Sequence, residues 1–507
     1  MLMHRVLIDG AERTPDKPAL HWVDRDTTLS YAQAVARMED MAGALASLGL
    51  RPGDRVTIFA HNGMDYLLAM FGAWRAGAIA AMVNVQFASE LEYYLADHTP
   101  SIVIYTHDMV APVKRAAMSI GTVQHLVCMD GPQAGAHSLP ELMSAKLPAP
   151  ADPADESAIA HLAYTSGTTG KPKGACLAHE PTMRAARCIA ERLRISAGDN
   201  SFGPTALSSS YQLVANLLPP LSRGASVHVM GRWTQVSGWA ALERTGASVL
   251  VANPTFLGQV LAESQLQGRP PARLRVGLSG GGPVPPSLKK AWREELKLPL
   301  VESFGQSELG GFMALGFPEI VADDGLLGRV GPALPDKEVR IVDANRSPLP
   351  PGQIGEIELR GGFMVGYWDK PEKTAEVIGT GWLRTGDLGL IDREGFITMR
   401  GRRSELIETD GVLWFPRDVE EAFCAIDGVA QAAVVGVADA THGQLPHAFI
   451  TLAPGHSSTA ESLKSAITGK VSYDIRALQV RVVSELPMTP TGKIAKGELA
   501  ARLAAAV

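Results

Sequence analysis

Residues 164–174 form a stretch of small, hydroxylated and basic side chains, Tyr-Thr-Ser-Gly-Thr-Thr-Gly-Lys-Pro-Lys-Gly. Its three glycines let backbone N–H groups approach an anion closely, and its hydroxyls and lysines add donors and positive charge. Such a stretch suits the phosphates of a nucleotide. It is not a Walker A loop, because Pro172 follows Lys171 where that loop has Ser or Thr. The candidate phosphate-binding residues are Thr165, Ser166, Gly167, Thr168, Thr169, Gly170, Lys171 and Lys173.

Apolar runs on both sides of this stretch predict that it connects two strands. Residues 158–163 are typical of a buried strand, residues 175–178 of a second strand, and residues 181–193 of a helix. A flexible surface loop is the alternative interpretation, and an ordered run of this kind between two strands disfavours it. We therefore expect the stretch to be a built anion site.

Strands and helices alternate over most of the first 300 residues. Ser30, for example, is positioned to cap a helix that continues to about residue 48, and a strand follows at residues 55–59. This alternation predicts an α/β fold whose parallel or mixed sheets have helices on both faces. From residue 328 short strands and frequent turns predict a β-rich subregion packed on the large domain.

A domain boundary is predicted at Gly401-Arg402. Residues 1–401 form the large N-terminal domain in this interpretation, and residues 402–507 form a small α+β domain. The tail of the small domain is a Pro-, Thr- and Gly-rich loop that contains Lys493. We find no internal repeat.

Composition excludes several classes of protein. The chain has 507 residues, 46% of them apolar and 20% charged, which is typical of a globular protein, and its formal charge of −6 gives no reason to expect nucleic acid as a partner. Its four cysteines form no CxxC pair, which favours reduced thiols in a cytoplasmic protein. The most apolar long stretch, residues 67–85, contains Arg75 and two glycines, so we expect no membrane span.

Three further clusters accompany the phosphate loop, at residues 302–308, 382–387 and 492–493, with the sequences Glu-Ser-Phe-Gly-Gln-Ser-Glu, Trp-Leu-Arg-Thr-Gly-Asp and Gly-Lys. Together, and in this order, the four clusters strongly resemble the adenylate-forming superfamily of acyl-CoA ligases, peptide-synthetase adenylation domains and luciferases. The resemblance covers nearly the whole chain from Thr14 and is strongest to acyl-CoA ligases. It implies that residues 1–401 are an AMP-binding domain and that residues 402–507 are a mobile C-terminal domain.

The resemblance implies a two-step reaction. A carboxylic acid reacts with ATP to give an acyl-adenylate and pyrophosphate, and the acyl group then passes to coenzyme A. Mg²⁺ would be held by Glu308, Ser307 would contact the α-phosphate, and Lys493 would bridge the carboxylate and that phosphate. These three residues are the implied catalytic group, with ATP, Mg²⁺ and coenzyme A as the implied cofactors.

The remaining implied roles concern the nucleoside, the acyl group and the hinge. Adenine and ribose would be held by Gly281, Gly282, Ser303, Phe304, Gly305, Asp387 and Arg402. Ser209, Tyr211 and Gly280 would line the acyl pocket. Because these walls are small and few charges are near them, we expect a bulky, largely apolar acid and not an amino acid. Ser404 would be the pivot between the two domains.

Some features leave alternatives open. Glu408 and Asp410 stand where the family often has neutral or basic residues, so the enzyme could mainly thioesterify an acyl-adenylate supplied by another enzyme. It could also be a stand-alone adenylation enzyme that loads a carrier protein, or a non-catalytic nucleotide-binding scaffold. The sequence does not name the acid, and a homodimer is possible.

Overall fold

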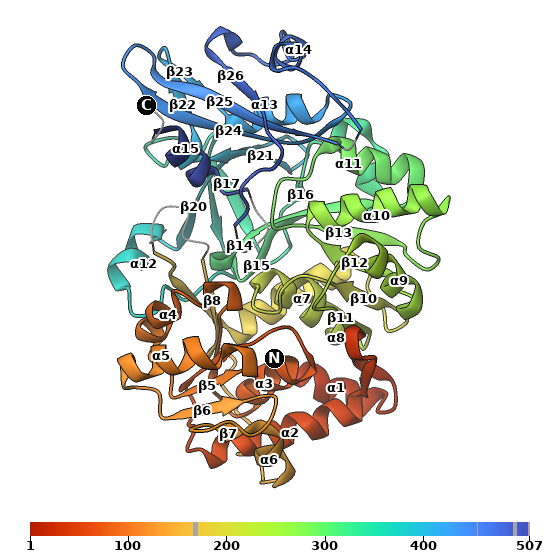
Figure 1. Ribbon diagram of the computed structural model, residues 1–507, viewed down its shortest axis with the longest axis vertical. Coiled ribbons are helices and arrows are strands. Elements are labelled where there is room, and N and C mark those ends of the chain that lie inside the picture. The colour runs from red at the N-terminus through yellow and green to blue at the C-terminus, as the bar shows by residue number, and fades with distance from the viewer. Residues whose placement is uncertain (166–170, 454, 490–493, 505–507) are drawn as a thin grey trace.

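The computed structural model describes residues 1–165, 171–453, 455–489 and 494–504. Figure 1 shows the early part of the chain at the bottom and the C-terminal domain, in blue, at the top. The helices before residue 401 are α1 (Arg5–Arg13), α2 (Tyr31–Ser47), α3 (Met64–Arg75), α4 (Leu91–His98), α5 (Val110–Ile120), α6 (Leu139–Ser144), α7 (His179–Arg192), α8 (Leu218–Ser222), α9 (Gln235–Thr245), α10 (Pro254–Gln267), α11 (Pro286–Ala291) and α12 (Pro371–Val377).

A seven-stranded sheet carries the phosphate-loop motif at one edge. In spatial order its strands are β7 (His137–Ser138), β6 (His125–Cys128), β5 (Ile102–Tyr105), β3 (Arg55–Phe59), β4 (Ile79–Met82), β8 (Ile159–Tyr164) and β9 (Gly174–Ala178). All neighbours are parallel except β8 and β9, which are antiparallel. Helix α2 begins after Ser30, whose side chain and that of Gln33 form a capping box, as the sequence predicts.

An eight-stranded sheet packs against the first. Its spatial order is β15 (Gly311–Leu315), β14 (Leu300–Gln306), β13 (Val276–Ser279), β12 (Val249–Ala252), β10 (Asn200–Gly203), β11 (Ser226–Val229), β1 (Pro18–Trp22) and β2 (Thr27–Ser30). The inner strands are parallel, and the two edge pairs β14–β15 and β1–β2 are antiparallel. The main apolar core includes side chains of both sheets, such as Val56 and Val251, and of the helices between them, such as Phe71 and Ile189.

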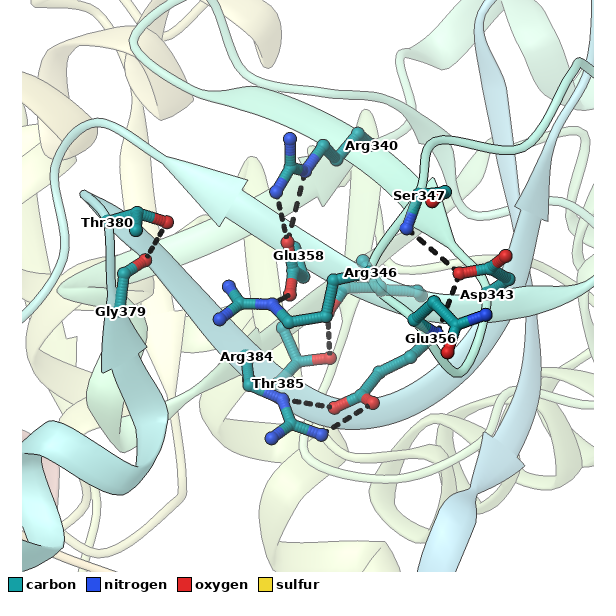
Figure 2. A network of polar contacts seen from close by, with 12 residues as sticks. Arg340, Asp343, Arg346, Ser347, Glu356, Glu358, Gly379, Thr380, Arg384 and Thr385 are labelled. Carbon is teal, nitrogen blue, oxygen red and sulfur yellow. Dashed lines mark hydrogen bonds and ion pairs between the residues drawn. The ribbon is translucent and has the colours of Figure 1, made fainter.

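The predicted β-rich subregion is a third sheet. Its strands are β16 (Gly331–Pro332), β21 (Phe396–Arg402), β20 (Trp382–Ile391), β18 (Gly355–Arg360) and β17 (Glu338–Val342), with β19 (Ile378–Gly379) beside β20. Two carboxylates on β18 pair with arginines of this subregion (Figure 2). The fully buried Glu358 accepts hydrogen bonds from Arg340 and Arg346, at 2.7 Å each, and Glu356 accepts from Arg384 at 2.9 Å.

The C-terminal domain is α+β, as predicted. Its sheet contains β23 (Val412–Trp414), β22 (Ile407–Thr409), β25 (Gly443–Leu452) and β24 (Val429–Asp439), with β26 (Gln479–Val482) beside β25, and its helices are α13 (Pro416–Cys424), α14 (Ala460–Ala466) and α15 (Lys496–Ala504). Strand β21 ends at Arg402, and a 3₁₀ turn over Arg403–Glu405 leads into this domain. Among the described helices none is both long and apolar enough to cross a membrane.

Candidate active site

Three antiparallel strand pairs, one in each sheet of the large domain, carry the three described clusters. The phosphate loop connects β8 and β9, and a 3₁₀ turn over Ser307–Leu309 connects β14 and β15. Asp387 and Arg402 are direct cross-strand partners on β20 and β21. Residues 302–306 of the second cluster belong to strand β14, and the 3₁₀ turn begins at Ser307.

The base of the phosphate loop is closed by Thr165 and Lys173. The Thr165 N–H donates to the Lys173 carbonyl at 3.0 Å, and its Oγ1 accepts from the Lys173 N–H at 3.2 Å. Beneath this base the Tyr164 hydroxyl donates to Asp97 at 2.9 Å. The predicted residues Ser166, Gly167, Thr168, Thr169 and Gly170 lie outside the described part of the chain.

Both lysines of the loop lie over aromatic rings. The Lys171 ammonium is 5.2 Å from the ring centre of Tyr93, and the Lys173 ammonium is 4.7 Å from that of Tyr367. An aromatic face attracts a cation at such distances. The tyrosine rings therefore help to orient the two charges.

Tyr367 joins the phosphate loop to the second cluster. Its hydroxyl donates to Glu308 Oε1 at 2.8 Å, and the Met364 N–H donates to the Glu308 carbonyl at 2.8 Å. The same segment pairs with β9, where the Cys176 N–H donates to the Gly366 carbonyl at 2.9 Å. Burial and the nearby Glu308 carboxylate raise the pKa of the Tyr367 hydroxyl, which stays a donor at neutral pH.

Gln306 joins the second cluster to the third. Its Nε2 donates to the Thr385 carbonyl at 3.0 Å and to Asp387 Oδ2. Arg402 Nε lies 3.5 Å from Asp387 Oδ1, and the Asp387 N–H donates to Thr385 Oγ1 at 3.0 Å. The Asp387 carboxylate is thus held between Gln306 of the second cluster and Arg402 of the neighbouring strand.

The acyl group is expected beside Ser209, Tyr211 and Gly280, and Tyr211 contacts both of the other two as well as the strands β12 and β13. Its buried hydroxyl lies 3.3 Å from the Ala252 carbonyl and 3.2 Å from the Leu278 carbonyl, at the ends of β12 and β13. A Cβ on Gly280 would collide with the Tyr211 ring and would lie 2.6 Å from Ser303 Oγ, so this close approach needs glycine. Ser209 Oγ accepts from the Tyr211 N–H at 3.3 Å.

Gly281 follows with a φ of +79°, and no atom lies within 4 Å of a Cβ placed there. A leucine at this position would therefore be strained by the backbone before it filled any pocket. Gly282 has no atom within 4 Å of a built Cβ either.

Ser303, Phe304 and Gly305 lie along β14. The Ser303 hydroxyl donates to the Ser279 carbonyl at 2.9 Å, and Phe304 packs at the margin of the β-rich core. A Cβ on Gly305 would lie 2.6 Å from the Gly311 carbonyl oxygen across the strand pair. Contacts of these residues with adenine stay predictions.

The predicted pivot Ser404 lies between two anchored residues. Arg403 Nη1 pairs with Glu356 of β18 at 2.9 Å, and Glu405 pairs with Lys496 of α15 at 2.9 Å. Neighbours on either side of Ser404 are thus held by the large and the small domain respectively. Lys493 lies outside the described residues, and its role stays a prediction.

Glu308 is the carboxylate expected to hold the implied Mg²⁺. The described residues contain no group of three or more His, Cys, Asp or Glu side chains that could hold a metal ion. Mg²⁺ is commonly bound by one or two carboxylates together with substrate phosphates. Tyr367 contacts both Glu308 and Lys173 of the phosphate loop, so Glu308 lies where that mode requires a carboxylate.

Two residues that connect this site, Gln306 and Tyr367, were not among the predicted site residues. Gln306 lies within the second cluster, and its position beside Ser307 was the only available signal. Tyr367 is part of a Gly-Tyr-Trp stretch that resembles acyl-CoA ligases. Gln306 is 81 residues from Asp387 in the sequence, and Tyr367 is 59 residues from Glu308. Local sequence patterns cannot predict contacts over such separations.

Comparisons with known proteins agree with this arrangement. The family model of AMP-binding enzymes matches residues 7–368, and that of the AMP-binding enzyme C-terminal domain matches residues 418–493. The two matches lie on either side of the predicted boundary at residues 401–402, which itself stays a prediction.

Two curated relatives and one solved structure illustrate the similarity. A feruloyl-CoA synthase of Amycolatopsis sp is 29% identical over 480 residues, covering 94% of each chain. The mitochondrial medium-chain acyl-CoA ligase ACSF2 of Mus musculus is 30% identical over 541 residues, covering 96% of this chain and 85% of the relative. The crystal structure of the anthranilate CoA ligase AuaEII with anthranoyl-AMP has a TM-score of 0.92 and 25% identity, covering 100% of this chain and 98% of that one. The chain thus belongs to the adenylate-forming superfamily of AMP-binding enzymes, and within it to the ATP-dependent, AMP-forming acid–CoA ligases.

Proposed function

We propose that this enzyme activates a bulky, largely apolar carboxylic acid with ATP and transfers the acyl group to coenzyme A. One observation carries the proposal: contacts of Tyr367 and Gln306 join the phosphate loop, Glu308 and Asp387 into one site. The site offers cations and donors toward a triphosphate at one end and a buried carboxylate toward ribose at the other. Gly281 and Gly282, where a built Cβ would meet no atom within 4 Å, would leave an acyl group room.

The chemistry follows from bringing two anions together. A carboxylate oxygen of the acid forms a bond to the α-phosphorus of ATP, and the bond to pyrophosphate breaks. Lys171, Lys173 and Lys493 would counter the negative charge, and Ser307 would donate to an α-phosphate oxygen. Mg²⁺ held by Glu308 would neutralise phosphate charge. In the second step the thiol sulfur bonds to the acyl carbon, AMP leaves and the thiol proton passes to solvent.

The acid is proposed from the walls around Tyr211 and from the relatives. The meeting segments present Ser209, Gly280 and backbone, and two of the similar proteins are named for ring-bearing acids while a third is named for medium-chain acids. Pyrophosphate release should be measured with benzoate-type, cinnamate-type, medium-chain, acetate and α-amino acids. Preference for acetate or an α-amino acid would contradict the proposal.

The alternative reactions differ in what they need. Comparable thioester formation from free acid plus ATP and from synthetic acyl-adenylate would eliminate an enzyme that depends on adenylate made elsewhere. Turnover with coenzyme A alone would eliminate an obligate carrier-protein loader. Asp410 Oδ1 lies 2.8 Å from His442 Nδ1, so this carboxylate is partly compensated, which weakens the argument for poor adenylation. Pyrophosphate release that stayed silent with every acid would favour the scaffold.

Tyr367→Phe tests the link between Glu308 and the phosphate loop. The phenylalanine keeps the ring under Lys173 but removes the hydrogen bond to Glu308, and a hydrogen bond to a charged group contributes about 1.5–3 kcal/mol. We expect a higher Mg²⁺ concentration at half-maximal adenylation and weaker binding of MgATP by calorimetry. Tyr93→Phe keeps the ring under Lys171 and removes a hydroxyl that donates to the Pro172 carbonyl of the loop but does not contact Glu308, so this matched variant should leave the Mg²⁺ dependence unchanged. Equal Mg²⁺ dependence of the Tyr367 variant and the parent would show that the Tyr367–Glu308 hydrogen bond does not affect Mg²⁺ binding.

Ser404→Pro tests the pivot. Proline fixes φ, and a pivot must absorb a change of backbone angles if the small domain rotates between the two steps. We expect thioester formation from supplied acyl-adenylate to fall far more than pyrophosphate release. Unchanged rates of both steps would place the hinge elsewhere.

A further inference from the structure

Lys496 is more enclosed than Arg502, the other described cation of α15. It is the first residue of α15, and its ammonium lies 2.9 Å from Glu405 Oε2 and 2.8 Å from Glu420 Oε1. Glu420 Oε1 also accepts from the Val434 N–H at 2.8 Å. One ammonium thus connects α15 to the 3₁₀ turn after the pivot, to α13 and, through Glu420, to β24.

The Lys496 ammonium keeps its charge at neutral pH. Burial acts to lower the pKa of Lys496, but the carboxylates of Glu420 and Glu405 outweigh it and raise the pKa to about 12. Well-packed apolar side chains often stabilise a fold as much as a buried ion pair does. The triad is therefore better explained by the position that it specifies than by the stability that it adds.

What the triad positions is the segment that contains Lys493. The Ala495 N–H donates to the Pro487 carbonyl at 2.8 Å, and Met488 and Ile494 form an antiparallel bridge. These contacts join residues 487–488 to residues 494–495, directly before Lys496. Lys493 is three residues before Lys496, so at most about 11 Å of chain separates their Cα atoms.

We propose that Lys496 is a positioning residue for Lys493: by pairing with Glu405 and Glu420 it holds the base of the 489–493 segment on the body of the C-terminal domain. The inference rests on the proposed role of Lys493 in adenylation. Lys496 itself contacts no reacting atom in this account. Because Glu405 follows Ser404, the triad lies wholly on one side of the proposed pivot and would move with the small domain.

A structural role alone would affect both half-reactions. If Lys496 only stabilised the domain, its loss would lower the unfolding temperature and slow adenylation and thioester formation together. If it positions Lys493, the loss should fall on adenylation, because only that step uses the Lys493 ammonium. The two roles are thus separated by measuring each step by itself.

Lys496→Met is the main variant, because it keeps side-chain length and removes the charge. A misplacement of about 1 Å can cost a hundredfold in rate, so we expect pyrophosphate release to fall about tenfold to a hundredfold. Thioester formation from synthetic acyl-adenylate should stay close to the parent rate. Lys496→Arg should recover most of the adenylation rate, since it restores a cation to Glu405 and Glu420.

Two further variants complete the experiment. Arg502→Met removes the other ion pair of α15, which is exposed and joins Arg502 to Glu498, and should change neither step. Glu405→Gln keeps Glu420 as a partner and should show a smaller loss confined to adenylation, which keeps the test decisive if Lys496→Met fails to fold. Equal losses in both steps, or no loss in Lys496→Met, would overturn the inference.

Failure of the inference and failure of the proposed function give different results. If Lys493→Ala abolishes adenylation while Lys496→Met leaves it intact, only the positioning role is wrong. If Lys493→Ala leaves adenylation intact, the assigned role of Lys493 is wrong. If the parent enzyme releases no pyrophosphate with any acid, the proposed function is wrong.

Discussion

Replacing Lys493 with alanine is expected to slow acyl-adenylate formation by about a hundredfold to a thousandfold or more. A donor aimed at charge that develops in the transition state contributes about 3–4 kcal/mol, and Lys493 is proposed to bridge two anions at that moment. Thioester formation from supplied acyl-adenylate should survive, since the phosphate bond has then already formed. Pyrophosphate release and thioester formation measure the two steps independently.

Lys470 provides the control for Lys493. It is an exposed lysine of the same domain, so Lys470→Ala removes an equal charge from the surface and should leave both steps unchanged. Equal loss of both half-reactions in Lys493→Ala would refute the assigned role. The same result would also remove the basis for a positioning role of Lys496.

Replacing Glu358 with alanine is expected to cost the β-rich subregion about 2–3 kcal/mol of stability, because it removes a fully buried carboxylate that accepts hydrogen bonds from two partly exposed arginines. The Glu358 side chain is fully buried and holds both Arg340 and Arg346 (Figure 2). Arg340 also lies 4.0 Å above the ring centre of Trp382. Urea unfolding followed by tryptophan fluorescence should report the loss.

The same two strands supply the control for Glu358. Glu338 of β17 pairs with Arg360 of β18, and both side chains are more than half exposed. Exposed pairs contribute about 0–1 kcal/mol, so Glu338→Ala should shift the unfolding midpoint little. Similar shifts in the two variants would show that burial does not determine the strength of these pairs.

Much of the fold could be predicted because its strands are short, apolar and separated by turn residues. The predicted strand at residues 55–59 coincides with β3, and Ser30 caps α2 as expected. Helix α1 was not predicted. Its buried residues Val6, Leu7 and Gly10 face a core formed by segments far along the chain.

The site could be predicted motif by motif but not as a connected whole. Spacing along the chain identifies Asp387 and Glu308, yet it carries no information on the contacts of Gln306 or Tyr367 with them. Those contacts depend on how three sheets meet. Gly281 shows the same limit, since its positive φ is a property of the fold and not of the residue type.

The anchoring of Tyr211 constrains how the acid preference of this enzyme could be changed. Its hydroxyl is shared between the carbonyls of Ala252 and Leu278, so a laboratory selection that exchanged this tyrosine would leave two strand ends without their donor. The hydrogen bond described for the Ser209 side chain is local, with the Tyr211 N–H, and does not join two strands. A library that varies Ser209 and keeps Tyr211 should therefore yield more folded variants with new substrate preferences than one that does the reverse.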